Sequence, residues 1–231
     1  MPRRPRLVIP GVPVHLVQRG VDRQACFFDD ADRRAYLDDL AQIAADVGCA
    51  IHAFVLMTNH VHLLLTPDGA DGPARLMNRL GRRYVRRIND LHRRTGTLWE
   101  GRFRSCITGD EGHVLACYRY VELNPVRAGM VADPLEYTWS SHSDNLGGEP
   151  VGFLTPHASY LALGPDRAAR AAAYRALFAE ALADETADQI RIATATNAPF
   201  ATRRFQQQIE AMLGRRVAPL PTGRPKKSDG A

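Results

Sequence analysis

Two apolar runs joined by a two-residue turn constrain the fold of this chain more than any other feature. Residues 50–57 read Ala-Ile-His-Ala-Phe-Val-Leu-Met, and residues 60–66 read His-Val-His-Leu-Leu-Leu-Thr. Only Thr58 and Asn59 separate them. Runs of this length with so short a connection are typical of an antiparallel β-hairpin. The sequence therefore predicts a hairpin whose second strand lies centrally in a sheet.

The second strand carries two histidines, His60 and His62, on either side of a valine. Because side chains alternate between the faces of a strand, both imidazoles share one face, and Val61, Leu63 and Leu65 occupy the other. Two rigid imidazoles on one face suit a divalent metal ion with one side left open. A half-buried strand whose polar face simply carries histidines is an equally good reading of this strand alone.

The elements around the hairpin indicate the fold class. We expect, in order, a strand at 12–18, a helix at 31–47, the hairpin, a helix at 73–92, a strand at 103–108 and a helix at 111–123. This order predicts an α+β, ferredoxin-like fold, in which two helices lie on one face of a four-stranded antiparallel sheet. The last helix is then an addition to that fold.

The Gly-rich segment at 144–150 predicts the end of the main domain, which gives a catalytic or binding domain at 1–145. Alanine-rich helices are expected at about 165–183, 185–195 and 201–213, within a helical region at 146–214. This region is either an accessory module or plain scaffold. The Pro-rich basic tail at 215–231 is expected to be disordered alone, and its Gly-Arg-Pro at 223–225 suits a minor groove or a non-specific basic tail equally well.

Positive charge is concentrated in one helix and the loop after it. The formal net charge is +5 and the pI about 9.3. Asp90 is the only acidic residue from Pro73 through Arg94. A polyanion such as DNA is therefore an expected partner, although a solvated charged surface is the alternative. The expected DNA-binding arginines of the helix are Arg79, Arg82, Arg83, Arg86 and Arg87.

The loop that follows mixes turn glycines with Trp99, Arg102 and Arg104, a combination suited to stacking bases and contacting phosphates. Trp99 is equally suited to anchoring a core. The four cysteines show no Cys-x-x-Cys spacing, so we expect reduced, buried thiols. The sequence has no apolar leader and no membrane-spanning segment, which favours the cytoplasm and no membrane partner.

The third helix contains Tyr118-Arg-Tyr-Val-Glu-Leu-Asn-Pro-Val-Arg-Ala-Gly129, in which Tyr120 and Asn124 lie one turn apart. Together with Asn59-His-Val-His-Leu-Leu64, this resembles the single-tyrosine HUH transposases, in particular the REP-associated tyrosine transposases. The resemblance runs from about Arg6 to Ser141.

The resemblance implies roles for individual residues. His60 and His62 would bind a divalent metal, Mg²⁺ or Mn²⁺, and Tyr120 would be the nucleophile. Asn124 stands where related enzymes place a polar third ligand, often Gln. Tyr118 points about 200° away around the helix and is expected in the core. The implied reaction cleaves and rejoins single-stranded DNA beside a hairpin through a 5′-phosphotyrosine, by a monomer or homodimer.

Two other functions remain open from the sequence. A domesticated regulator that holds hairpin DNA without cutting it would need only the basic features. A metal hydrolase of small molecules would use the two histidines, but it explains neither Tyr120 nor the arginines. Because every presumed catalytic position is filled, the enzyme is favoured.

Overall fold

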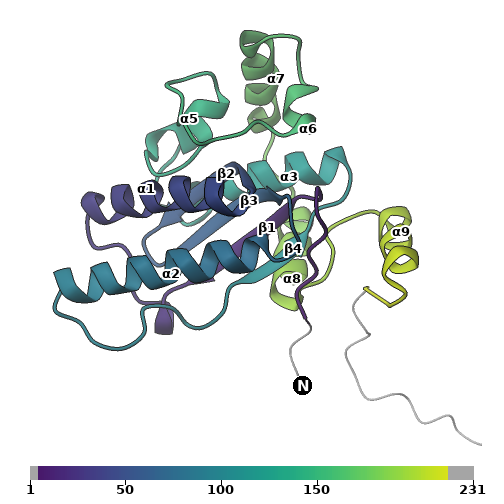
Figure 1. Ribbon diagram of the computed structural model, residues 1–231. Helices are drawn as coiled ribbons and strands as arrows, with labels where there is room; N and C mark the ends of the chain where they lie inside the picture. Colours follow the sequence, from purple (N-terminus) through teal and green to yellow (C-terminus); the bar gives the residue numbers. More distant parts are fainter. Residues whose placement is uncertain (1–4, 218–231) are drawn as a thin grey trace, which may run out of the picture.

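A four-stranded antiparallel sheet forms the centre of the computed structural model, which describes residues 5–217 (Figure 1). The strands are β1 (Val14–Arg19), β2 (Cys49–Met57), β3 (His60–Pro67) and β4 (Arg104–Ile107). Their order in the sheet is β2-β3-β1-β4, and every neighbouring pair is antiparallel. This order, with one helix after β1 and another after β3, confirms the predicted ferredoxin-like fold.

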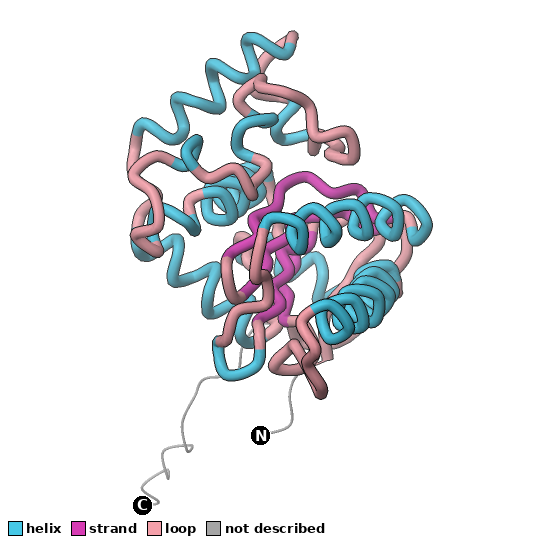
Figure 2. Tube along the Cα trace, turned by 90° about the vertical axis from the view of Figure 1, so that its left-hand side faces the viewer, coloured by secondary structure: helices cyan, strands magenta, loops and turns pink. Residues whose placement is uncertain are grey.

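Helices cover both faces of the sheet (Figure 2). One face carries Val61, Leu63 and Leu65 of β3 and packs against α1 and α2, as predicted. The opposite face, with Leu64 and Val55, packs against α3 and α8. The long helices are α1 (Asp30–Val47), α2 (Gly72–Leu91), α3 (Glu111–Glu122), α7 (Arg167–Ala179), α8 (Asp184–Thr196) and α9 (Arg203–Leu213).

Capping residues explain where the helices begin and end. Asp29 accepts a hydrogen bond from the Asp32 amide at the start of α1, and Gly48 ends that helix at φ 67°. Asp110 caps α3 in the same way. The helices that sequence periodicity missed are four-residue turns, too short to show an amphipathic period: α4 (Asn124–Arg127), α5 (His142–Asn145) and α6 (Ala158–Leu161). Two short 3₁₀ turns, Val21–Arg23 and Pro134–Glu136, were missed as well.

The C-terminal helices that composition predicted are α7, α8 and α9. Helix α8 packs against β4 across the expected boundary near residue 145. Phe200, which follows α8, donates its amide to the carbonyl of Ile107 in β4. The boundary itself stays a prediction. Gly223–Pro225 lie outside the described residues.

Two other expectations concern thiols and membranes. All four cysteines are buried and form no disulfide, as expected. Between residues 5 and 217, no helix is long and apolar enough to cross a bilayer.

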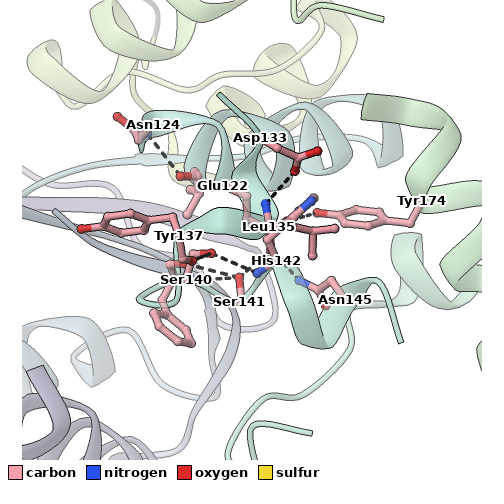
Figure 3. Close-up of polar contacts among 12 residues, drawn as sticks. Glu122, Asn124, Asp133, Leu135, Tyr137, Ser140, Ser141, His142, Asn145 and Tyr174 are labelled. Carbon is pink, nitrogen blue, oxygen red and sulfur yellow. Dashed lines mark hydrogen bonds and ion pairs between the residues drawn. The ribbon is translucent and has the colours of Figure 1, made fainter. Parts of the chain in front are cut away.

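A buried carboxylate ties α3 to α5 and α7. Glu122, fully buried near the end of α3, accepts hydrogen bonds from four side chains (Figure 3). Their distances are 2.5 Å from Ser141 Oγ, 2.7 Å from His142 Nδ1, 2.7 Å from Asn145 Nδ2 and 2.8 Å from Tyr174 OH. Every lone pair of the carboxylate is thus matched by a donor, as a buried charge requires. The end of α3 is held in one position as a result.

We expect Glu122→Ala to lower the free energy of unfolding by about 3 kcal/mol, because four buried donors lose their shared acceptor. Urea denaturation of the full chain measures this. The matched control is Glu149→Ala, an exposed glutamate on the loop after α5, for which we expect a change within about 0.5 kcal/mol. Equal effects of the two substitutions would show that the cluster does not stabilise the fold.

Candidate functional site

The two histidines of β3 lie together on the sheet face that α3 covers. Their ring centroids are 5.0 Å apart, and both side chains stand on the same side of the strand. Strand β1 runs alongside, with Val17 opposite His62 and Arg19 opposite His60. His62 is only 3% exposed, and His60 is half-buried. The convergence that strand alternation predicted is therefore present.

His60 is held through its neighbour Asn59. The Asn59 amide nitrogen donates to the backbone carbonyl of Arg23 at 2.8 Å, which leaves Oδ1 to accept from His60 Nδ1 at 2.6 Å. His60 Nε2 is then the unprotonated ring nitrogen. Burial, followed by the charge of Arg19, lowers the pKa of His60 to about 4, so this imidazole is neutral at pH 7.

His62 is held by a third histidine, which no sequence motif singled out. Nε2 of His15, on β1, lies 2.9 Å from Nδ1 of His62, and the planes of the two rings differ by only 10°. Both side chains are almost completely buried. Burial lowers the pKa of His15 to about 3 and that of His62 well below its usual value, so both rings are neutral.

Tyr120 of α3 faces the histidines. Its ring lies 5.7 Å from that of His62 and 5.6 Å from that of His15, centroid to centroid. Burial raises the pKa of its phenol, and Arg191 and Arg127 oppose that rise, Arg191 partly through a hydrogen bond. The phenol is therefore protonated at pH 7.

Tyr118 lies on the other side of α3, as expected. It is fully buried beside Tyr160 and Tyr174, and its hydroxyl accepts a hydrogen bond from the amide of His157. Of the two tyrosines, Tyr120 alone lines the cavity next to the histidines.

Asn124 begins α4, just after Tyr120's helix ends. Its Nδ2 donates to the carbonyl of Tyr120 at 2.7 Å, and its side chain also contacts His60. Because the amide nitrogen donates to the helix, the oxygen is the atom left to face His60. An imidazole nitrogen and an amide oxygen side by side are candidate ligands for a cation.

No group of three or more His, Cys, Asp or Glu side chains suited to a metal ion occurs within residues 5–217. The candidate ligands His60, His62 and Asn124 differ from such groups, because they combine two imidazoles with one amide. Such ligands accept Mg²⁺ or Mn²⁺ when water completes the coordination.

A cavity of about 290 Å³ opens beside these residues and is lined by His15, His62 and Tyr120. His60 and Asn124 lie next to it and are not among its lining residues. Its walls are strongly basic, with Glu100 as the single acid among the residues that line it. The lining arginines are Arg19, Arg23, Arg102, Arg104 and Arg191.

Helix α8 supplies part of this cavity, which composition did not predict. Arg191, Thr194 and Ala195 of α8 line it together with residues of β1 and α3. Arg191 also pairs with Asp188 of its own helix.

Arg102 and Arg104 lie at the cavity wall, and both side chains are exposed.

The five selected arginines of α2 fall into two groups. Arg79 pairs with Asp46 at 2.7 Å and Arg83 with Asp39 at 3.1 Å, both acids being on α1. Sequence spacing missed these partners because it reveals only acids within one helix. The exposed Arg82, Arg86 and Arg87 form no ion pair with any residue from 5 to 217.

Trp99 lies mainly in the core. Its indole is 6% exposed and packs near Tyr36 and Tyr84. It also lines a second, more open cavity of about 630 Å³, together with Arg82 and Arg102. The structure therefore favours the core-anchor interpretation of Trp99 over base stacking.

The sequence alone did not place His15, Arg19 or Thr194 in the site. His15 and Arg19 share one face of β1 by simple alternation, but the sequence did not reveal which strand β1 pairs with. Thr194 lies in an alanine-rich helix with a weak pattern, so nothing in the sequence placed it near the histidines.

Comparisons with known proteins identify the family and support the fold. The sequence model of the family described as "Transposase IS200 like" matches residues 9–124, which hold both histidines, Tyr120 and Asn124. A search of curated proteins found no match.

Solved structures give the same fold. A REP-associated tyrosine transposase bound to a REP hairpin superposes with a TM-score of 0.57 at 17% identity, over 69% of this chain and 96% of that one. A protein from Deinococcus radiodurans R1 described as a transposase gives a TM-score of only 0.38 at 20% identity, over 55% of this chain and 97% of that one, which is too low to inform the fold. Because the family model matches half of this chain, residues 9–124, the chain belongs to the IS200-like transposase family.

Proposed function

We propose that this protein cleaves and rejoins single-stranded DNA beside hairpin or palindromic repeats, through a covalent bond between Tyr120 and the DNA 5′ phosphate. The observation that carries the proposal is that the Tyr120 phenol and the His62 imidazole line one arginine-rich cavity, with His60 and Asn124 beside it. Nucleophile, ligands and cations for a phosphodiester thus meet in one place.

The ligand set fits a divalent metal ion, Mg²⁺ or Mn²⁺. His60 Nε2, His62 Nε2 and Asn124 Oδ1 are the atoms that would hold it. Bound there, the ion supplies Lewis-acid stabilisation of the charge that develops on the scissile phosphate.

The residues of the chain perform the remaining steps. The Tyr120 oxygen attacks phosphorus, a tyrosine–phosphate bond forms, the bond to the 3′ oxygen breaks, and the phenolic proton is released as the 3′ hydroxyl becomes protonated. Arg191, which contacts the phenol, favours its ionised form during attack. Because one phosphodiester replaces another, the free 3′ hydroxyl can reverse the reaction and rejoin strands.

Basic side chains outside the cavity would hold the flanking DNA. Arg102 and Arg104 extend the basic wall of the cavity to the surface, and Arg102 also lines the second cavity together with Arg82 of α2. The similarity in fold to a REP-associated transposase bound to a REP hairpin supports hairpin DNA as the substrate class and the REP-associated branch as the place of this chain.

The first test compares two tyrosines of one helix. With Mn²⁺, labelled hairpin DNA should form a covalent adduct that survives a denaturing gel, and Tyr120→Phe should abolish it with hairpin affinity nearly unchanged, because only the nucleophilic oxygen is lost. Excess chelator should also abolish the adduct. The matched control, Tyr118→Phe, should retain it.

An adduct that persists in Tyr120→Phe would contradict the assignment of the nucleophile. DNA binding by the unaltered protein without any adduct would instead favour the regulator that holds hairpins without cutting them.

The second test concerns α2. Replacing Arg82 and Arg86 with Gln should weaken binding to all single-stranded sequences alike and flatten the dependence of log affinity on log salt by about 0.7 per lost contact. Fluorescence anisotropy over a salt series measures both. Replacing Arg79 and Arg83, which pair with Asp46 and Asp39, is the matched control and should change the slope less. An unchanged slope in the Arg82 and Arg86 variant would identify this face as a merely solvated surface.

A further inference from the structure

A chain of hydrogen bonds links His62 to helix α8 and has no role in the proposal above. Thr194 Oγ1 lies 2.8 Å from the carbonyl oxygen of Ile190 and 3.0 Å from Nδ1 of His15. Nε2 of His15 lies 2.9 Å from Nδ1 of His62. Thr194, His15 and His62 are all at least 95% buried, so water does not replace these contacts.

Which atoms donate and which accept in this series of hydrogen bonds follows from the bond at the Ile190 end. A backbone carbonyl can only accept, so in this contact the Thr194 hydroxyl donates its one proton to the carbonyl oxygen of Ile190. The Thr194 oxygen is then an acceptor toward His15, and His15 Nδ1 must carry a proton. Because a neutral imidazole has only one N–H, His15 Nε2 is left as an acceptor for the Nδ1 proton of His62.

The surroundings agree with this direction. The His15 ring is only 1% exposed, and a buried charge without a carboxylate partner is costly, so the neutral ring with a single N–H is favoured. Cys106 Sγ lies 3.3 Å from the same Thr194 oxygen and 4.0 Å from His15 Nδ1. With its own proton on the Ile190 carbonyl, the Thr194 oxygen can accept from both His15 and Cys106.

We propose that Thr194 and His15 act as positioning residues that fix His62 in the Nδ1–H tautomer, so that its Nε2 lone pair is available to a divalent cation. The proposal rests on the proposed metal site. It also gives α8 a specific role. Composition placed this helix in an accessory region, but its Thr194 ends the series of hydrogen bonds that orients His62.

His60 has the same Nδ1–H tautomer for a separate reason, because its Nδ1 donates to the fixed side-chain amide of Asn59. Two independent acceptors therefore leave Nε2 as the unprotonated nitrogen of both histidines. A ligand whose other nitrogen is held by a protein acceptor is better oriented and a stronger donor, and the loss of such a partner lowers metal affinity by about 10- to 100-fold.

The direct test is the tautomeric state of the imidazoles in the metal-free full chain. Long-range ¹H–¹⁵N NMR of the histidine side chains at pH 7 should show His15 and His62 as Nδ1–H tautomers. An Nε2–H tautomer at His62 would overturn the proposal, and this measurement needs neither a variant nor activity.

The second readout is Mn²⁺ affinity, measured by electron paramagnetic resonance. We expect Thr194→Val to weaken Mn²⁺ binding about tenfold or more and to give a mixture of tautomers at His62, whereas Thr194→Ser should stay within about threefold of the unaltered chain. The matched control is Thr196→Val, because Thr196 makes the same bond to a carbonyl four residues back in the same helix but is exposed.

His62→Ala separates this inference from the proposed function. If the unaltered chain does not bind Mn²⁺, or if His62→Ala binds it equally well, the metal site itself is wrong. If His62→Ala abolishes binding but Thr194→Val changes neither affinity nor tautomer, the metal site stands and the positioning role of Thr194 is wrong.

Discussion

The pairing of β1 with β3 is the constraint on which the rest of the site depends. With Val17 opposite His62 and Arg19 opposite His60, the odd-numbered residues of β1 share a face with the two histidines of β3. A shift of one residue would turn His15 to the other face and remove the partner of His62. The face so formed is completed by Tyr120 from α3 and by Thr194 and Arg191 from α8, so two helices far apart in the sequence meet at one strand pair.

Burial of this face has opposite consequences for its two kinds of titratable group. Removal of water disfavours charge, which lowers the pKa of the three imidazoles and raises that of the Tyr120 phenol. Neutral imidazoles are the form that binds metal ions, so burial favours the ligands. The same burial makes Tyr120, the proposed nucleophile, harder to ionise, and Arg191 and Arg127 counteract that effect. Glu122, two residues from both Tyr120 and Asn124, fixes the end of the helix that carries them.

Local patterns in the sequence predicted the hairpin, the capped helices and the sharing of one face by His60 and His62, because alternation and capping depend on neighbouring residues only. The role of Tyr120 came from its resemblance to a known motif. The ion pairs of the α2 arginines with Asp46 and Asp39 and the contact of Thr194 with His15 join residues between 33 and 179 positions apart. Trp99 likewise packs near Tyr36 of α1. Such contacts depend on how helices dock against the sheet, which no local pattern encodes.

Peptide mapping of the covalent product tests the central claim most directly. The full chain would be incubated with a hairpin oligonucleotide and Mn²⁺, digested with nuclease and protease, and analysed by mass spectrometry. We expect a nucleotide joined through its 5′ phosphate to Tyr120, in the peptide that also contains Glu122. A nucleotide attached to any other residue, or joined through its 3′ phosphate, would contradict the site and the chemistry described above.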